Sequence, residues 1–198
     1  MNAIDPDRSV LVLVDYQLRL MPAIHRSEQV LAEALRLAEV AGELGIAVLG
    51  TEQNPAGLGA NVPALRQRCA HTLAKMHFDA CADGLLGMLE GPRPPAAWGA
   101  DPTGAQSPPG LEVVIAGCEA HVCLLQTALG LLRAGHRVWV VAPACGSRSA
   151  VDHELAMQRL RQAGAVIVSS EMVVFEWLRS CGHARFKPVL ALVRQRLD

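Results

Sequence analysis

Six short apolar segments alternate with helical patterns along this chain, and this alternation limits its fold more than any other feature. The first segment, residues 9–16 (SVLVLVDY), is a continuous apolar run with a carboxylate near its end, which is typical of a strand buried on both faces. Strands that alternate with helical crossovers form a parallel sheet with helices on both sides. We therefore expect residues 1–198 to form a single three-layer α/β/α domain around a six-stranded parallel sheet.

The spacing of apolar residues and the positions of glycine and proline predict the individual elements. Strands are expected at 9–16, 46–51, 71–76, 112–117, 137–142 and 165–170, and helices at 28–44, 84–90, 121–134, 150–163 and 187–197. Ser27 is the expected N-cap of the first helix, and Pro188 fits the first turn of the last one. Residues 91–110 are rich in proline and glycine around Trp98, and we expect a long surface loop or a lid there.

Charge and hydropathy argue against several classes of protein. The formal net charge is −1 with both signs interspersed, which is unlike the basic surface of a nucleic-acid-binding protein. The sequence has no run of about 18 apolar residues and no leader pattern, so we expect a cytoplasmic protein without a membrane segment. Hydrophobic residues make up 51% of the chain, and this excess predicts a buried interface in a homo-oligomer, a dimer at least.

Six cysteines are scattered along the chain without a CxxC pair or the spacing of a zinc ribbon. Reduced thiols are expected in a cytoplasmic protein, and most of them should be inert core residues. Their positions are 69, 81, 118, 123, 145 and 181.

Three polar residues stand at the carboxyl ends of expected strands: Asp15 at the first, Lys75 at the third and Cys123 just past the fourth. Singly, each has an ordinary structural explanation, as a turn cap, a solvated lysine or a packed thiol. Open parallel sheets bind their ligands at this edge, where the strand order reverses. Taken together, the three residues therefore indicate one site.

The chemistry of these three groups is complementary. A thiol attacks as the thiolate, and the first turn of a helix over 121–134 should favour the thiolate of Cys123 through its free N–H groups and dipole. Lys75 adds positive charge, and Asp15 can accept the thiol proton. The same N–H groups can bind an oxyanion. The combination predicts acyl transfer through a thioester, with Cys123 more reactive than the other cysteines.

Residues 117–149 (GCEAHVCLLQTALGLLRAGHRVWVVAPACGSRS) resemble the signature of the isochorismatase-like cysteine hydrolases, which include nicotinamidases and other amidohydrolases. Further pieces match in the family's order and span nearly the whole chain: 12–17 (VLVDYQ), 51–59 (TEQNPAGLG), 75–78 (KMHF), 170–178 (SEMVVFEWL) and 186–190 (FKPVL). The resemblance implies a sheet with the strand order 3-2-1-4-5-6. It also implies a catalytic triad at Asp15, Lys75 and Cys123.

Two further features follow from the same resemblance. The peptide bond between Cys118 and Glu119 is expected to be cis, which for a residue other than proline is normally retained only at functional sites. The backbone N–H groups of Glu119 and Cys123 are expected to form the oxyanion hole.

The chain departs from the family pattern in two places. Thr51 and Gln53 stand where nicotinamidases carry the Asp and His of a metal motif, so we expect neither a metal nor a cofactor. His71 and His77 flank Lys75 without a neighbouring carboxylate, and we interpret them as packed or solvated side chains. Pro143 replaces the family's usual Asp, and the sequence offers no account of this change.

The sequence therefore predicts a hydrolase that cleaves a small amide through a thioester on Cys123. Gln53 is a candidate for hydrogen-bonding the small-molecule substrate, with a turn residue as the alternative. Two other functions stay open: vinyl-ether hydrolysis at the same site, and a non-enzymatic binding or assembly protein that retains the fold. The identity of the substrate does not follow from the sequence.

Overall fold

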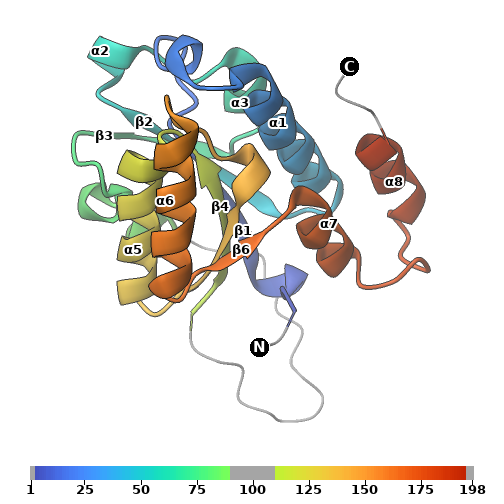
Figure 1. The fold of residues 1–198 in the computed structure, drawn as a ribbon. Helices are drawn as coiled ribbons and strands as arrows, with labels where there is room; N and C mark the ends of the chain where they lie inside the picture. The colour runs from blue at the N-terminus through green and yellow to red at the C-terminus, as the bar shows by residue number, and fades with distance from the viewer. Residues whose placement is uncertain (1–2, 90–109, 195–198) are drawn as a thin grey trace.

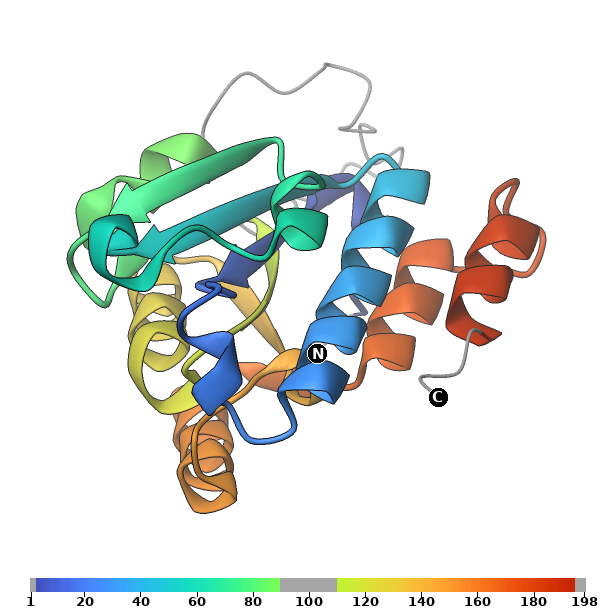
Figure 2. The ribbon, with the colours of Figure 1, turned by 90° about the horizontal axis from the view of Figure 1, so that it is seen from above.

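Six parallel strands form one sheet in the order β3-β2-β1-β4-β5-β6 (Figures 1 and 2). The computed structural model describes residues 3–89 and 110–194. Its strands are β1 Ser9–Val14, β2 Ala47–Gln53, β3 His71–Lys75, β4 Glu112–Gly117, β5 Arg137–Val141 and β6 Val166–Val168. The six-stranded parallel sheet and its strand order confirm the prediction.

The two central strands are β1 and β4, and every residue in both is buried. Helices cover both faces of a parallel sheet, which explains why these strands are apolar without alternation. Strand β3 lies at one edge of the sheet, and only its last residue, Lys75, is buried. A buried lysine at the end of an otherwise half-exposed edge strand requires a partner inside the protein.

The helices lie in two layers. Helices α1, α7 and α8 cover one face of the sheet, and α5 and α6 cover the other (Figures 1 and 2). The helices are α1 Ser27–Glu43, α2 Pro55–Leu58, α3 Pro63–Arg66, α4 Leu85–Leu89, α5 Leu125–Arg133, α6 Ala150–Gln162, α7 Ser170–Leu178 and α8 Phe186–Arg194. Pro188 lies in the first turn of α8, as predicted.

Two predicted boundaries are wrong. Helix α1 begins at Ser27 itself, and its N-cap is Arg26, which has a left-handed backbone (φ 56°) and makes no side-chain capping bond. Strand β6 ends at Val168 and not at residue 170, because the Ser169 side chain accepts a hydrogen bond from the Met172 N–H and starts α7. Both errors arise where a serine stands near a helix start.

The predicted surface loop at 91–110, with Trp98, lies outside the described residues except for Gly110. The prediction of a single domain over 1–198 stays a prediction. None of the helices in the described ranges combines the length and the apolar character that crossing a membrane requires.

Candidate active site

Three neighbouring strands bring polar side chains to the carboxyl edge of the sheet. Asp15 directly follows β1, Gln53 is the last residue of β2, and Lys75 is the last residue of β3. The sheet register pairs Gln53 with Lys75 on adjacent strands, so both side chains leave the sheet on the same face. The strand order reverses between β1 and β4, and ligands of such sheets bind at this position.

Asp15 and Lys75 form a buried ion pair. Lys75 Nζ lies 2.8 Å from Asp15 Oδ2, and neither side chain has any exposed surface. The Thr51 hydroxyl donates a 2.6 Å hydrogen bond to Asp15 Oδ1. Within the described residues, Asp15 Oδ2 faces the ammonium but receives no hydrogen bond of proper geometry, so a lone pair on it is available for a proton.

The backbone of Asp15 is left-handed, with φ 55°, which is uncommon for a residue with a side chain. Its N–H still donates to the Thr51 carbonyl oxygen at 3.2 Å, so the change of direction occurs within one residue of the strand. A strained backbone at a buried charged residue is often found at functional sites. Strand β1 therefore ends one residue before Asp15 and not at residue 16 as predicted.

Cys123 lies in a π-helical turn, Ala120–Leu124, which separates β4 from α5. The Leu124 N–H donates to the Glu119 carbonyl oxygen at 3.2 Å, five residues back. The predicted α-helix over 121–134 was therefore wrong in its first turn. Single π-turns of this kind are frequent at functional sites, because they change the direction of one side chain within a helix.

The Cys123 thiol lies against both charged members of the site. Its pKa is raised to about 12, first by burial and then by the Asp15 carboxylate, while Lys75 acts in the lowering direction. Lys75 thus favours the thiolate, as expected, but its effect does not keep the thiol deprotonated in the resting protein. Burial and the Asp15 carboxylate outweigh it, because a buried thiolate would lose its hydration beside a negative charge.

Gln53 connects Lys75 to Cys123. Its Oε1 accepts a 2.7 Å hydrogen bond from Lys75 Nζ, and its Nε2 donates to the Met76 carbonyl oxygen at 2.7 Å. An ammonium only donates and a carbonyl only accepts, so these two partners fix the orientation of the amide. Cys123 Sγ lies 3.8 Å from the same Oε1. Gln53 is thus a strand residue with an engaged side chain, and neither the predicted loop position nor a turn role fits it.

The chain between β4 and Cys123 approaches β1 closely. A Cβ atom at Gly117 would lie 2.4 Å from the Val14 carbonyl oxygen, so only glycine fits there. The following peptide bond, between Cys118 and Glu119, is cis, as the resemblance implied. The Glu119 carboxylate lies 2.8 Å from the Arg148 guanidinium, directed away from Lys75 and Asp15 into the turn before α6.

Comparison with known families decides the relationship of this chain. A family model described as the isochorismatase domain matches residues 9–172. This chain belongs to the isochorismatase family. It is 34% identical over 190 residues to isochorismatase domain-containing protein 2A of Mus musculus, covering 96% of this chain and 84% of that protein. The human isochorismatase domain-containing protein 2 is also 34% identical over 190 residues, at 96% and 85% coverage.

Solved structures share the isochorismatase-family fold. A structure described as MAR1 ribonuclease from Caenorhabditis elegans has a TM-score of 0.85 and 30% identity, covering 100% of this chain and 95% of that one. The YcaC gene product of Escherichia coli, described as an octameric hydrolase of unknown specificity, has a TM-score of 0.78 and 21% identity, at 98% and 88% coverage. The chain therefore has the fold of isochorismatase-family hydrolases.

The histidines of this isochorismatase-family chain lie outside the triad. His71 begins β3 on the exposed surface, and His77 is exposed with its Nδ1 2.8 Å from Asp83 Oδ1. This carboxylate partner was not evident from the sequence, because Asp83 is six residues from His77 in the chain and no sequence pattern links the two residues. In the described part of the chain, no three His, Cys, Asp or Glu side chains come together as metal ligands. Thr51, which stands where nicotinamidases are expected to carry an Asp, donates to Asp15.

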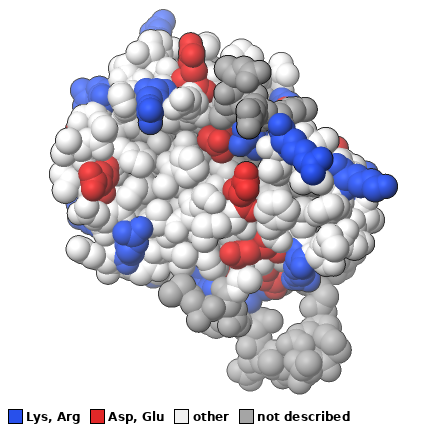
Figure 3. Space-filling view, turned by 45° about the vertical axis from the view of Figure 1, so that its right-hand side comes forward, with Lys and Arg blue, Asp and Glu red and all other residues white. Residues whose placement is uncertain are grey.

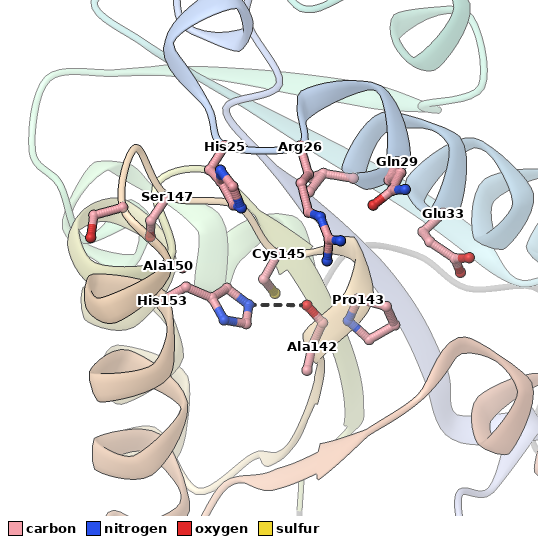
Figure 4. Close-up of a pocket in the computed structure, with 13 residues that line it drawn as sticks. His25, Arg26, Gln29, Glu33, Ala142, Pro143, Cys145, Ser147, Ala150 and His153 are labelled. Carbon is pink, nitrogen blue, oxygen red and sulfur yellow. Dashed lines mark hydrogen bonds between the residues drawn. The ribbon is translucent and has the colours of Figure 1, made fainter. Parts of the chain in front are cut away.

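A separate pocket of about 390 Å³ is drawn in Figure 4. Its walls come from the start of α1, the turn after β5 and the start of α6, and Asp15, Lys75 and Cys123 do not line it. Pro143, which replaces the family's usual Asp, lines this pocket within the short helix Ala142–Ala144. The replacement therefore changes the wall of this pocket.

Proposed function

We propose that this protein hydrolyses a small amide through a thioester on Cys123. The observation that carries the proposal is the contact of one thiol with both members of a buried Asp15–Lys75 ion pair. A nucleophile, a proton acceptor and a fixed positive charge then meet at one point of the protein. Membership of the isochorismatase family and the fold of its hydrolases support hydrolysis as the reaction type.

The first half of the reaction forms the thioester. Asp15 accepts the Cys123 proton as Sγ attacks the carbonyl carbon, and the C=O electron pair moves onto oxygen. The backbone N–H groups of Glu119 and Cys123 stabilise this oxyanion. When the carbonyl reforms, the carbon–nitrogen bond breaks, and the proton on Asp15 passes to the departing nitrogen. The amine leaves as a neutral molecule.

The second half consumes water. The oxygen of a water molecule attacks the thioester carbonyl while Asp15 accepts a proton from that water. The carbon–sulfur bond then breaks. The proton returns to the sulfur of Cys123, and the carboxylic acid leaves. Each cycle thus converts one amide and one water into one acid and one amine.

A protonated resting thiol is compatible with this cycle. With a pKa of about 12, Cys123 does not lose its proton to bulk solvent near neutral pH. It loses it instead to Asp15 Oδ2 during the attack, when charge moves from sulfur to the substrate oxygen. Lys75 stays beside the carboxylate throughout and compensates its charge at 2.8 Å. In this proposal, Gln53 orients Lys75, because both ends of its amide are already hydrogen-bonded within the protein.

The rival functions differ in what they require of the site. Vinyl-ether hydrolysis needs an acid but no thioester, so the buried thiol would have no role. A ribonuclease, the description of the Caenorhabditis elegans relative, needs groups that bind phosphate. Here Lys75, the lysine of the site, is already paired with Asp15. Over the one face of the molecule that Figure 3 draws, acidic and basic side chains are interspersed among uncharged ones. These observations favour the small amide.

The test is a panel of small primary and secondary amides scored for release of ammonia or amine. Wild-type protein should turn over at least one amide, and Cys123→Ala should abolish this turnover because no other group can form the thioester. Cys181→Ala is the matched control, because this cysteine is exposed and remote from the triad, and it should keep full activity. Mass spectrometry of the quenched reaction should locate an acyl adduct on Cys123.

Three outcomes would overturn the proposal. Equal turnover by Cys123→Ala and wild-type protein would remove the thioester. Cleavage of a fluorogenic RNA or of a vinyl ether, with no amide turned over, would assign the site to one of the rival reactions. Absence of turnover in all three assays would leave the binding protein as the function.

We also infer a homo-oligomer. Large apolar side chains are exposed on two helices beside the edge strand β6: Val151 and Leu155 on α6, and Met172 and Phe175 on α7. Each pair is three or four residues apart and so occupies one face of its helix. The octameric YcaC hydrolase, 21% identical to this chain, provides a related fold that assembles.

A further inference from the structure

Asp83 holds the segment that immediately follows Lys75. Asp83 Oδ2 accepts hydrogen bonds from the backbone N–H groups of Met76, at 2.7 Å, and His77, at 2.8 Å. Asp83 Oδ1 lies 2.8 Å from His77 Nδ1. Asp83 itself is the last residue of the short helix Ala80–Asp83, which packs against β3.

The same two residues face the candidate active site through their carbonyl groups. The Met76 carbonyl oxygen accepts from Gln53 Nε2 at 2.7 Å. The His77 carbonyl oxygen lies 3.4 Å from Lys75 Nζ. The N–H groups of Met76 and His77 are therefore hydrogen-bonded to the Asp83 carboxylate. Their carbonyl oxygens are hydrogen-bonded to the side chains of Gln53 and Lys75.

We propose that Asp83 is a positioning residue for the Asp15–Lys75–Cys123 site, acting through the backbone of Met76 and His77. The inference rests on the proposed function for its link to turnover. Asp83 touches neither Cys123 nor Asp15. It fixes the Met76 carbonyl, that carbonyl fixes the Gln53 amide, and the amide oxygen then fixes the Lys75 ammonium.

The orientation of the Gln53 amide is the sensitive step in this chain of contacts. An amide can rotate by half a turn about its last bond, which would exchange oxygen for NH₂. The rotated amide would place N–H groups against the Lys75 ammonium, two donors without an acceptor. Only the Met76 carbonyl, at 2.7 Å, opposes this rotation on the far side of the amide. A displaced Met76 would therefore disorder both Gln53 and Lys75.

The Asp83 carboxylate is suited to this role over a wide pH range. Its pKa is lowered to about 2, first by the hydrogen bond from the His77 side chain and further by the backbone N–H groups of His77 and Met76. It therefore accepts hydrogen bonds as an anion near neutral pH. Charge-assisted acceptors of this kind make the stronger hydrogen bonds.

The experiment compares Asp83→Ala with Asp79→Ala. Asp79 is the matched control, because it starts the same short helix, accepts a backbone N–H from Cys81 and pairs with Arg133, but contacts neither Met76 nor His77. Asp83→Ala should lower kcat about ten- to a hundredfold with little change in KM, the cost of a misplaced catalytic group. Asp79→Ala should keep the wild-type kcat. Asp83→Asn should restore most activity, because the carboxamide oxygen can accept from both N–H groups.

A second readout does not depend on turnover. Lys75 lowers the pKa of Cys123, so a displaced ammonium should slow alkylation of Cys123 by iodoacetamide at pH 9. A general loosening of the fold would change the alkylation rate in the opposite direction, because it would expose the buried thiol of Cys123 and speed its alkylation. If no amide is hydrolysed by wild-type protein, the proposed function fails, while this alkylation rate still tests Asp83.

Three results would overturn the proposal: an unchanged kcat in Asp83→Ala, an equal loss in Asp79→Ala, or faster alkylation of Cys123 in Asp83→Ala. Should Asp83→Ala not fold, hydrogen exchange on the wild-type protein decides. The amide hydrogens of Met76 and His77 should be protected, since Asp83 is their acceptor. Free exchange of these two amides would show that Asp83 does not hold them.

Discussion

Lys75 Nζ lies 2.8 Å from Asp15 Oδ2 in a pair without exposed surface, although the two residues are 60 positions apart in the chain. Lysine side chains are almost always exposed, but Lys75 is among the largest fully buried side chains of the protein. The pair is retained because each charge compensates the other inside a site that also contains a protonated thiol.

Replacing Lys75 by Met should destabilise the fold. Removing one partner of a buried pair leaves an uncompensated charge, so Lys75→Met should lower the free energy of unfolding by about 3–5 kcal/mol. The measurement is urea denaturation followed by circular dichroism. Arg185→Met is the control, because Arg185 pairs with Glu43 at 3.9 Å on the exposed surface, where the change should stay within about 1 kcal/mol. Equal stability of Lys75→Met and wild type would mean that Asp15 does not need its partner.

Alkylation of Cys123 should depend steeply on pH. The thiol pKa is raised to about 12, so the rate with iodoacetamide should increase about tenfold per pH unit between pH 7 and 10. Peptide mapping at each pH gives the rate for each cysteine. Exposed Cys181 is the internal control and should be labelled before Cys123 at neutral pH, which reverses the order that the sequence alone predicted. A rate for Cys123 that levels off near pH 7 would contradict the raised pKa.

Stability should fall at high pH. Burial raises the pKa of Cys123 and of Cys145 to about 12 in the folded protein, above the value of 9.0 for an ordinary thiol. The folded state then binds more protons than the unfolded state between pH 9 and 12. The contribution of these thiols is therefore complete below pH 9 and is lost as pH rises towards 12. Cys145→Ala should flatten the fall in unfolding free energy over this range; an unchanged slope would argue against its burial as a neutral thiol.

Chelation should leave amide hydrolysis unchanged. Thr51 and Gln53 stand where nicotinamidases are expected to carry their metal motif, and both side chains are hydrogen-bonded within the site. Activity after dialysis against EDTA should equal that of untreated protein. A loss that zinc or iron restores would show that a metal takes part in the reaction.

Light scattering at micromolar concentration should give a mass of at least twice the 21.1 kDa of one chain. Leu155→Glu should reduce this mass, because it places a charge on the exposed apolar face of α6. Arg161→Gln changes the net charge by the same amount about a third of a turn away from Leu155 around α6, and it should not change the mass. A mass near 21 kDa for the wild-type protein would contradict the homo-oligomer.

The sequence by itself determined the sheet and the edge at which the site lies. Continuous apolar runs between helical patterns are typical of strands covered on both faces, and parallel strands bring their carboxyl ends to one edge. Asp15 and Lys75 were therefore predictable at the same edge, because Asp15 stands near the end of such a run and Lys75 near the end of the shorter strand expected at 71–76. The resemblance to the family added the strand order and the cis peptide bond before Glu119, and the structure confirmed both.

Only the tertiary structure decided the backbone conformation, the hydrogen bonding and the thiol acidity of the site. The left-handed Asp15, the π-turn around Cys123 and the two-sided bonding of Gln53 depend on contacts between segments far apart in the chain. Local patterns of hydropathy cannot predict such contacts. Burial is likewise a property of the packed molecule. It raises the pKa of Cys123, where the sequence predicted a lowered one, because the loss of hydration disfavours the thiolate more than the Lys75 ammonium favours it.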